Sequence, residues 1–364
     1  MSAKTRPILV MAGGTGGHVY PALAVARALM AHSQEVVWLG THRGLEARVV
    51  PDAGIDIEWI NVRGLRRKGK LALFIAPLQL AWALLQSLAV IARRRPAAVL
   101  GMGGFVSGPG GFAAWLTRRP LVIHEQNAAA GLTNRLLARL ARVVLQAFPG
   151  SFNSRVTVET VGNPVREDIA AVAAPAERYN NRQGRMRLLV LGGSQGSLAL
   201  NQTVPMALAK LPAAERPDVH HQCGSLTLDT AQAAYADSGV DVNLVPFIED
   251  MAAAYAWADL VVCRAGALTV AELCAVGLPA LFIPYPAAAD DHQTANARPM
   301  ADAGAAVIID ESMLSPEVLA AQLRDSLSSR QELRGKAELA HGLSQPGALA
   351  RITQLCLEQA GVDL

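Results

Sequence analysis

The strongest constraint on the fold is a repeated alternation between short apolar runs and longer segments of helical period. In the first half of the chain the apolar runs predict strands at Ile8–Met11, Val36–Leu39, Ile57–Ile60, Ala98–Leu100, Leu121–His124 and Val143–Gln146. After the Asn-Pro turn in "VGNPVREDI" (161–169) the pattern starts again, at Leu188–Leu191, Val219–Gln222, Val242–Val245, Leu260–Cys263, Ala280–Ile283 and Ala306–Ile309. Strands that alternate with helices indicate parallel sheets covered on both faces. We therefore predict an α/β protein with two doubly wound, Rossmann-like domains.

The length of 364 residues also favours two domains, because a single hydrophobic core stops growing below that size. We expect domains at 1–164 and 165–345, with a last helix at about 346–364 packed back on the first. Hydrophobic residues make up 51% of the chain, so disorder is excluded, and no motif points to nucleic acid. The N-terminal apolar run is too short for a secretory signal. The four cysteines form no CxxC pair and are predicted to be reduced and buried.

Three glycine-containing turns precede predicted helices. "MAGGTGGHVYPALAVARAL" (11–29) and "LGGSQGS" (191–197) fit neither the dinucleotide pattern nor a Walker sequence. Both would still present backbone N–H groups at a helix N-terminus, which favours phosphate. "RAGALTVAE" (264–272) is a third such turn, in which Glu272 is placed to accept hydrogen bonds from ribose hydroxyls. Tight turns without a ligand, and a solvated glutamate, are the alternatives.

Two histidines lie where predicted strands or turns end. His18 follows the first glycine turn, and an imidazole at a loop end is suited to act as a general base near neutral pH. A purely structural role is the alternative. His124, in "VIHEQNA" (122–128), is predicted to lie at the edge of the site and to orient other groups rather than transfer a proton. "HEQNA" lacks the second histidine of a zinc-protease helix, so no metal site is predicted.

One uncharged segment, Leu71–Ala92, is long enough to qualify as a transmembrane helix. Pro77 is expected to interrupt it, and Gln79, Gln86 and Ser87 form a polar stripe, which argues against a span. A span would also separate two glycine turns that are expected to belong to one sheet. We predict an amphipathic helix at a membrane surface, with a helix buried in the protein as the alternative.

Seven segments together resemble one family. They are "MAGGTGGHVYPALAVA" (11–26), "GMGGFVSGPGG" (101–111), "HEQNAAAGLTNRLLA" (124–138), "VGNPVR" (161–166), "LGGSQGS" (191–197), "FIEDMAAAYAWADLVVCRAGALTVAE" (247–272) and "DDHQTANA" (290–297). Their combination is similar to the bacterial UDP-N-acetylglucosamine transferases that act on lipid I, in glycosyltransferase family 28. The resemblance implies the GT-B fold, two Rossmann-like domains with a deep cleft. It implies inverting transfer of N-acetylglucosamine (GlcNAc) from UDP-GlcNAc to the C4 hydroxyl of the muramyl sugar (MurNAc) of undecaprenyl-pyrophosphoryl-MurNAc-pentapeptide (lipid I), giving lipid II.

The resemblance also implies roles for residues at matching positions. His18 is the implied general base, and the implied acceptor side consists of Gly13, Gly14, Gly103, Gly104 and His124. The implied donor contacts are Thr15, Gly16, Gly17, Asn127, Arg166, Ser194, Ile248, Ala267, Leu268, Thr269, Val270, Ala271, Glu272 and Gln293. In the family the uracil meets backbone around Ile248, the ribose meets Glu272, and Gln293 reaches the sugar. Phe105 stands where some relatives carry tyrosine, so a phenol hydroxyl has no role there.

The implied partners are UDP-GlcNAc, lipid I, an anionic membrane surface and other proteins of cell-wall synthesis; no cofactor or protein-held metal is expected. Membrane association at the cytoplasmic face of the inner membrane is predicted to be peripheral, through Leu73, Phe74, Ile75, Leu78 and Trp82. Two other functions stay open. One is a GT-B enzyme with other substrates, and the other is a non-catalytic module that binds nucleotide sugars.

Overall fold

The computed structural model describes residues 6–62, 70–153, 156–180, 182–193, 196–286 and 291–362, with the side chains of residues 70–75 outside the description. The chain divides into two compact units. Unit 1 holds residues 1–164 and 347–364, and unit 2 holds residues 165–346. The chain therefore leaves unit 1 after Pro164 and returns to it at Gly347.

Unit 1 is built on a parallel sheet. Within the described residues the sheet has seven strands, in the order β3 (Asp56–Trp59), β2 (Val36–Gly40), β1 (Ile8–Met11), β4 (Ala98–Gly101), β5 (Leu121–Glu125), β6 (Val143–Gln146) and β7 (Glu159–Thr160). The register places Met11 of β1 between Leu39 of β2 and Gly101 of β4. Strands β1, β2 and β4 carry no charged side chain and are buried throughout, as expected for a parallel sheet covered on both faces.

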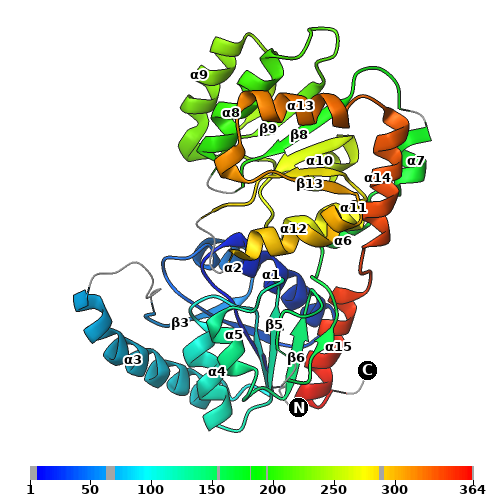
Figure 1. Ribbon diagram of the computed structural model, residues 1–364. Helices are drawn as coiled ribbons and strands as arrows, with labels where there is room; N and C mark the ends of the chain where they lie inside the picture. Colours follow the sequence, from blue (N-terminus) through cyan, green and yellow to red (C-terminus); the bar gives the residue numbers. More distant parts are fainter. Residues whose placement is uncertain are drawn as a thin grey trace. The chain divides into compact units, whose positions relative to one another are not determined.

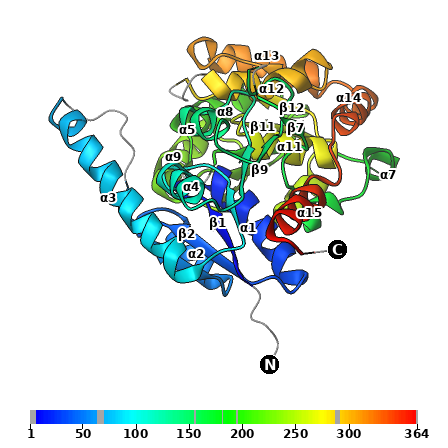
Figure 2. The same cartoon turned by 90° about the horizontal axis from the view of Figure 1, so that it is seen from below.

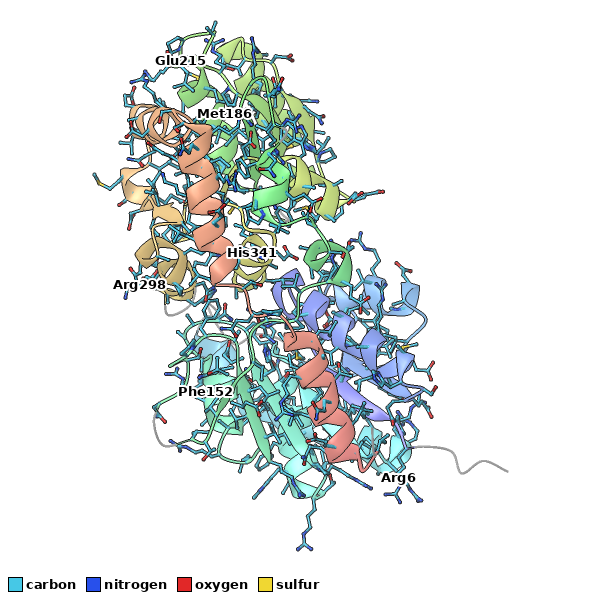
Figure 3. All side chains as sticks on the ribbon, turned by 90° about the vertical axis from the view of Figure 1, so that its right-hand side faces the viewer. Arg6, Phe152, Met186, Glu215, Arg298 and His341 are labelled. Atoms are coloured by element: carbon cyan, nitrogen blue, oxygen red, sulfur yellow. The ribbon has the colours of Figure 1, made fainter. Side chains whose placement is uncertain are left out.

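Helices cover the two faces of this sheet (Figure 1). Ile8 and Val10 pack on one face with helices α1 (Gly16–Ala31), α2 (Glu46–Asp52) and α15 (Ala348–Ala360). Leu9 and Met11 pack on the other face with α3 (Lys70–Arg94), α4 (Ser107–Leu116) and α5 (Leu132–Leu137). The C-terminal helix α15 runs beside α1, so the end of the chain completes the first core (Figure 3).

Helix α3 continues through Pro77, so the prediction that this proline interrupts the segment is wrong. The proline ring removes one backbone hydrogen bond, and a helix of 25 residues retains enough others to continue. The first turns of α3 extend beyond the rest of unit 1 (Figure 2). Leu78 is 72% exposed and Trp82 57% exposed, whereas Ala83 and Ile91 are buried, so the alternative of a fully buried helix is also wrong.

Of the three polar side chains of the predicted stripe, Gln79 is exposed, whereas Gln86 and Ser87 make hydrogen bonds within the protein. Ser87 is buried and its hydroxyl donates to the carbonyl of Ala83, while Gln86 Oε1 accepts the backbone N–H of Asn61 at 2.8 Å. By length and composition, one helix of the described chain, Ala76–Arg94, could cross a membrane, and 28% of that stretch is buried in the protein.

Unit 2 repeats the plan of unit 1. Within the described residues its parallel sheet has six strands, in the order β10 (Asn243–Val245), β9 (Asp218–Gln222), β8 (Arg187–Leu191), β11 (Leu260–Cys263), β12 (Ala280–Phe282) and β13 (Ala306–Ile308). Leu188, Val190 and Val262 pack with one set of helices: α7 (Pro175–Asn180), α8 (Leu198–Ala209), α9 (Leu228–Ser238), α13 (Pro316–Ser326) and α14 (Arg330–Gly342).

A second set of helices in unit 2 packs together around buried Tyr255, Leu273 and Met300: α6 (Glu167–Ala170), α10 (Met251–Trp257), α11 (Ala267–Val276) and α12 (His292–Asp302). The described residues of unit 2 also include the 3-10 turns η1 (Ser225–Thr227) and η3 (Glu311–Met313).

One buried carboxylate links the amino-terminal ends of the central strands β8 and β11. Asp259 accepts the backbone N–H of Arg187 at 3.0 Å, lies 3.3 Å from Nη1 of Arg330 and forms an ion pair with Arg182.

The predicted fold class of two doubly wound sheets is confirmed. Each predicted strand is found within one residue of its expected ends, because these runs are apolar and bounded by turns. Strand β7 was not predicted, since its two residues are polar. The prediction for the cysteines is confirmed: Cys223, Cys263, Cys274 and Cys356 are free and buried.

Candidate active site

Both sheets reverse their strand order at one point, and the glycine turns lie there. The reversal falls between β1 and β4 in unit 1, and between β8 and β11 in unit 2. Doubly wound sheets bind ligands outside the carboxyl ends of their strands at such a point. The turns that follow these four strands are therefore where a ligand is expected.

In unit 1 the turns after β1 and β4 touch through glycines. Gly104 has φ +80°, and a Cβ there would lie 2.2 Å from the carbonyl oxygen of Gly13. Gly103 has φ +95°, and a Cβ there would lie 2.6 Å from Nδ1 of His18. Neither backbone conformation nor the available space suits a side chain. The structure thus places Gly103 against His18 and Gly104 against Gly13.

Helix α1 begins directly after the first turn. Thr15 precedes it with an extended backbone and makes no side-chain capping bond. Gly16 and Gly17 are the first helical residues, and N–H groups in a first turn have no intrahelical acceptor. Together with the partial positive charge of a helix N-terminus, they suit an anionic group.

A buried carboxylate holds the first turn in place. Glu46, in the first turn of α2, is fully buried. Its Oε2 accepts the backbone N–H of Gly14 at 2.9 Å, and its Oε1 accepts the N–H and the hydroxyl of Thr41 at 3.0 and 2.8 Å. Because three donors converge on one carboxylate, these bonds anchor the turn to α2.

His18 is held by side chains from the end of β5. Its Nδ1 lies 3.1 Å from Oε1 of Gln126. The Nε2 of Gln126 donates to the carbonyl of Met102 at 2.9 Å and lies 3.2 Å from Nδ1 of His124. The Nε2 of His124 lies 2.9 Å from the carbonyl oxygen of Gly162. The prediction that His124 lies at the edge of the site is wrong, because its ring is fully buried behind Gln126. That burial lowers the pKa of His124 to about 4.

The loop after β5 folds around Glu125. Its Oε1 accepts the backbone N–H and the side-chain amide of Asn127 at 3.0 and 3.1 Å. Its Oε2 accepts the N–H of Gly131 at 3.2 Å and the amide of Asn134 at 2.9 Å. Asn127 therefore lies at the same end of the sheet as His18, with its amide turned toward Glu125.

In unit 2, helix α11 starts directly after β11. Gly266 precedes the helix with an extended backbone and has no side chain to cap it. Leu268 and Thr269 lie in the first turn, where N–H groups lack intrahelical acceptors. Val270 is a core residue whose N–H donates to the carbonyl of Gly266 at 2.9 Å. Val270 therefore offers a ligand neither its side chain nor its N–H, contrary to the predicted contact.

Glu272, in the second turn of α11, is the carboxylate of this half. It is partly buried and accepts a hydrogen bond from the hydroxyl of Tyr255 at 2.8 Å. Burial raises the pKa of Glu272 to about 7, although the Tyr255 hydrogen bond and the charge of Arg166 act in the opposite direction. Arg166, at the start of α6, lies 3.6 Å from Asp168 through its Nε. An acid with this pKa gains or loses its charge near neutral pH.

The remaining predicted donor residues lie on other turns of unit 2. Ile248 lines a pocket of about 440 Å³ together with Trp257. Oε1 of Gln293 accepts the backbone N–H of Tyr285 at 2.9 Å. Ser194 lies outside the described residues, and so do the side chains of Leu73, Phe74 and Ile75.

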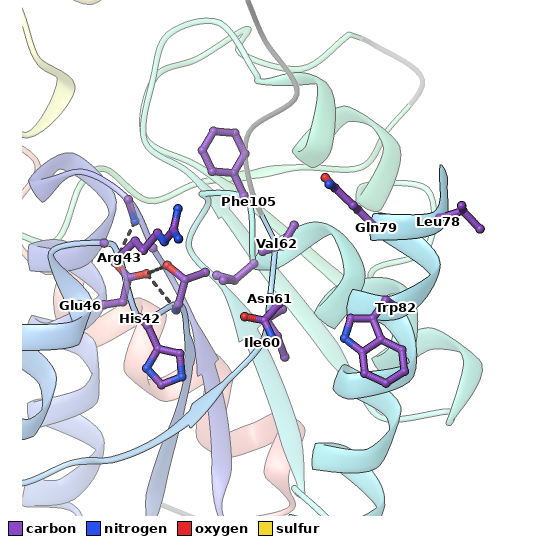
Figure 4. A pocket seen from close by; sticks show the side chains of 15 residues that line it. His42, Arg43, Glu46, Ile60, Asn61, Val62, Leu78, Gln79, Trp82 and Phe105 are labelled. Carbon is purple, nitrogen blue, oxygen red and sulfur yellow. Dashed lines mark hydrogen bonds between the residues drawn. The ribbon is translucent and has the colours of Figure 1, made fainter. Parts of the chain in front are cut away.

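A second pocket, of about 730 Å³, opens beside the first glycine turn of unit 1 (Figure 4). Arg43 and Glu46 lie on one wall, and Gln79 and Trp82 of α3 lie on the other, with Phe105 above. Arg43 is exposed and has no hydrogen-bond or ion-pair partner among the described residues. The pocket thus combines a free cation with an aromatic wall.

Three residues of these sites were not predicted. Gln126 stands between Glu125 and Asn127 in a segment that was singled out, but a glutamine carries no charge to mark it. Glu46 lies 32 residues after Gly14, and no sequence pattern links the two. No sequence pattern marks Tyr255 either. In the described part of the chain no group of three His, Cys, Asp or Glu side chains could hold a metal ion.

Comparison with known proteins assigns the chain to a family. Residues 8–146 match the glycosyltransferase family 28 N-terminal domain, and residues 187–350 match the glycosyltransferase family 28 C-terminal domain. The chain is 58% identical over 356 residues to the UDP-N-acetylglucosamine--N-acetylmuramyl-(pentapeptide) pyrophosphoryl-undecaprenol N-acetylglucosamine transferase of Alkalilimnicola ehrlichii, covering 98% of this chain and 99% of that one. It is 50% identical over 368 residues to the enzyme of the same name from Burkholderia pseudomallei, covering 100% and 99%.

Solved structures agree with this assignment. The crystal structure of Acinetobacter baumannii MurG is 41% identical and superimposes with a TM-score of 0.82, covering 97% of this chain and 99% of that one. The calicheamicin glycosyltransferase CalG4, at 17% identity and a TM-score of 0.70 over 99% of each chain, shares the fold alone. The two parallel α/β sheets are those of the GT-B fold. The chain belongs to glycosyltransferase family 28, in the group of the UDP-N-acetylglucosamine--N-acetylmuramyl-(pentapeptide) pyrophosphoryl-undecaprenol N-acetylglucosamine transferases.

Proposed function

We propose that this chain transfers GlcNAc from UDP-GlcNAc to the C4 hydroxyl of MurNAc in lipid I, with inversion at the anomeric carbon, and so forms lipid II. The observation that carries the proposal is the 58% identity over nearly the full length to a transferase whose name states this sugar and this acceptor. The glycine turns at the reversal points of both sheets support it, because they suit the anionic groups of both substrates.

His18 is the general base in this proposal. As the C4 oxygen of MurNAc attacks the anomeric carbon of GlcNAc, its proton passes to Nε2 of His18. The bond between that carbon and the diphosphate oxygen breaks, and UDP leaves with the bonding electrons. His18 suits this role because it is partly exposed and lies against the two glycine turns. General-base assistance of this kind contributes about 10²–10⁴-fold in rate.

Unit 2 binds the donor in this proposal. The first-turn N–H groups of α11 at Leu268 and Thr269, and the guanidinium of Arg166, offset the charge of the diphosphate as UDP leaves. Glu272 accepts the ribose hydroxyls, the backbone at Ile248 meets the uracil, and Gln293 meets the sugar. The resemblance adds Thr15, Gly16, Gly17, Asn127, Ser194, Ala267 and Ala271 as further contacts.

The pocket beside the first glycine turn holds the acceptor in this proposal. Its chemistry fits a diphosphate that is attached to an isoprenoid chain: the free cation of Arg43 and the N–H groups of the turn suit the anionic part. The indole of Trp82, Leu78 and Phe105 suit the apolar part, and all three are exposed. Acceptor-side contacts at Gly13 and Gly14 follow from the same arrangement.

The exposed apolar side chains of α3 support this face as the membrane contact. Leu78, Trp82 and Leu85 are exposed along α3, and the adjoining α4 adds Phe112 and Trp115, whose rings stack at 5.3 Å. We infer that the protein attaches peripherally to the cytoplasmic face of the inner membrane, where it would take up lipid I. Other proteins of cell-wall synthesis are its proposed partners there.

One assay separates this function from its alternatives. The chain is incubated with UDP-GlcNAc, with and without a short-chain lipid I analogue, and both UDP release and the disaccharide product are measured. The proposal expects UDP in equal amount to disaccharide, and only with the acceptor present. A binding module would release no UDP, and a GT-B enzyme with another acceptor would leave the analogue unmodified; either result would refute the proposal.

A further inference from the structure

The side chain that touches His18 fixes which of its two ring nitrogens can accept a proton. In a neutral imidazole one nitrogen carries hydrogen and the other is the base, and the partner of one nitrogen decides which form is present. The assignment follows from the hydrogen-bond network around the ring. The network here can be traced to backbone carbonyls, which only accept hydrogen bonds.

The first anchor of the network is the carbonyl oxygen of Met102. Because it lies 2.9 Å from one end of the Gln126 side-chain amide, that end must be the NH₂ group. The other end is then the oxygen, which lies 3.1 Å from Nδ1 of His18. An amide oxygen cannot donate, so Nδ1 of His18 must carry the hydrogen.

The second anchor is the carbonyl oxygen of Gly162. It lies 2.9 Å from Nε2 of His124, so that nitrogen carries the hydrogen and Nδ1 of His124 has a lone pair. This lone pair lies 3.2 Å from the NH₂ group of Gln126 and suits its second hydrogen. Since burial lowers the pKa of His124 to about 4, His124 stays neutral near physiological pH and continues to accept. A flipped Gln126 amide would bring its oxygen against two acceptors.

Packing holds the ring of His18 in this arrangement. Gln126 is 1% exposed, and its backbone carbonyl accepts the side-chain amide of Asn163 at 3.0 Å. On the other side Gly103 leaves room for the His18 ring, because a Cβ there would lie 2.6 Å from Nδ1. The ring thus has one supported nitrogen and one that is left for a substrate.

We propose that Gln126, backed by His124, is a positioning residue that holds His18 in the form with hydrogen on Nδ1, so that Nε2 is the proton acceptor. The proposal rests on the proposed function for its catalytic consequence, because it explains why the attacking hydroxyl would meet a lone pair and not an N–H. Its structural content, the form of the ring, can be measured without any turnover.

The first experiment determines the tautomer of each histidine ring, that is, which nitrogen carries the hydrogen. It uses NMR of the full chain labelled with ¹³C and ¹⁵N in histidine. The chain carries its own references. Nδ1 of His32 lies 2.9 Å from the carbonyl oxygen of Ala28 and must carry hydrogen, whereas in His124 the hydrogen is on Nε2. In the wild type we expect the ring nitrogen chemical shifts of His18 to resemble those of His32, with hydrogen on Nδ1. In Gln126→Met we expect them to move toward those of His124, with hydrogen on Nε2. A wild-type His18 with hydrogen on Nε2 would overturn the proposal.

The second experiment measures kinetics with UDP-GlcNAc and a short-chain lipid I analogue. Loss of one supporting hydrogen bond should lower kcat of Gln126→Met by roughly 10-fold, while KM for UDP-GlcNAc changes little. In a His18→Ala background the same substitution should add no further loss, because Gln126 acts only through His18.

The outcomes of the two experiments are separable. An equal loss from Gln126→Met with and without His18 would mean that Gln126 has only a structural role, and the proposal would fail. If the wild type transfers no GlcNAc, the proposed function fails, yet the NMR signals of His18 still decide whether Gln126 fixes the ring. Hydrogen exchange of unit 1 in Gln126→Met, unchanged from the wild type, controls for misfolding.

Discussion

The two units share their strand order but support their key side chains in different ways. In unit 1, His18 rests on a series of neutral groups that ends at backbone carbonyls. In unit 2, Glu272 rests on the hydroxyl of Tyr255 under the field of Arg166. The buried carboxylates of the two units also have different partners. Glu46 of unit 1 accepts hydrogen bonds from neutral N–H and O–H groups, whereas Asp259 of unit 2 pairs with two arginines. Sheet topology therefore sets where a ligand is expected to bind. The residues of the loops set whether the side chains there are suited to proton transfer or to binding a charged group.

The largest expected effect is on turnover and concerns His18, the key side chain of unit 1. We predict that His18→Ala lowers kcat by about 10²–10⁴-fold, because the attacking hydroxyl loses its proton acceptor. The affinity for UDP-GlcNAc, measured by calorimetry, should stay near that of the wild type because unit 2 supplies most donor contacts. Near-normal turnover in this variant would remove the general base from the mechanism.

The next effect compares the two buried carboxylates. Asp259→Ala leaves Arg182 buried without its charged partner and should destabilise unit 2 by about 3–5 kcal/mol. Glu46→Gln keeps the size of the side chain but not its charge, and should destabilise unit 1 by about 1–3 kcal/mol. Hydrogen exchange read by mass spectrometry follows each unit separately. Equal losses in the two variants would contradict the distinction between charge-paired and neutral surroundings.

A smaller effect tests Glu272 as the ribose contact. Glu272→Ala should weaken UDP-GlcNAc binding by roughly 10- to 100-fold, the usual result of losing hydrogen bonds to a charged acceptor. Tyr255→Phe is the matched control, because it removes the neighbour of the carboxylate and keeps the carboxylate itself. If both variants bind the donor as the wild type does, Glu272 does not contact it.

The membrane face gives a comparison of exposed leucines in the two units. Leu85 of α3 is 57% exposed and Leu226 of unit 2 is 86% exposed. Leu85→Asp should weaken sedimentation with anionic vesicles by roughly 10-fold, since one apolar side chain no longer enters the membrane. Leu226→Asp should leave sedimentation unchanged. Equal behaviour of the two variants would place the membrane contact elsewhere.

The smallest effect is a pH dependence that belongs to unit 2. The pKa of Glu272 is raised from 4.5 to about 7, so the folded protein holds this proton more tightly than the unfolded chain does. Its contribution to stability is therefore present below pH 4.5 and is lost as pH rises through about 7. Glu272→Gln should flatten this decline, whose slope for one proton cannot exceed about 1.4 kcal/mol per pH unit. Denaturant titrations across this range would measure it, and identical slopes in both proteins would contradict it.

Much of the fold could be predicted because its signals are local. Runs of three to five mostly apolar residues predicted the strands, and glycine turns before helices gave candidate ligand sites, which stay predictions. The role of Pro77 could not be judged from the sequence, because a proline within a helix is tolerated or not according to the rest of that helix. The burial of His124 was missed for a similar reason, since its position at the end of β5 says nothing of what covers it.

The sequence by itself determined the two α/β units and the family, and it singled out His18 and Glu272 as candidate site residues, because these depend on residue type and on spacing within short segments. Only the tertiary structure decided how those side chains are supported. Gln126 is 108 residues from His18, and Glu46 is 32 residues from Gly14. No local pattern encodes such pairs. They form because parallel strands bring their carboxyl ends to one edge of a sheet, where residues distant in the chain become hydrogen-bond partners.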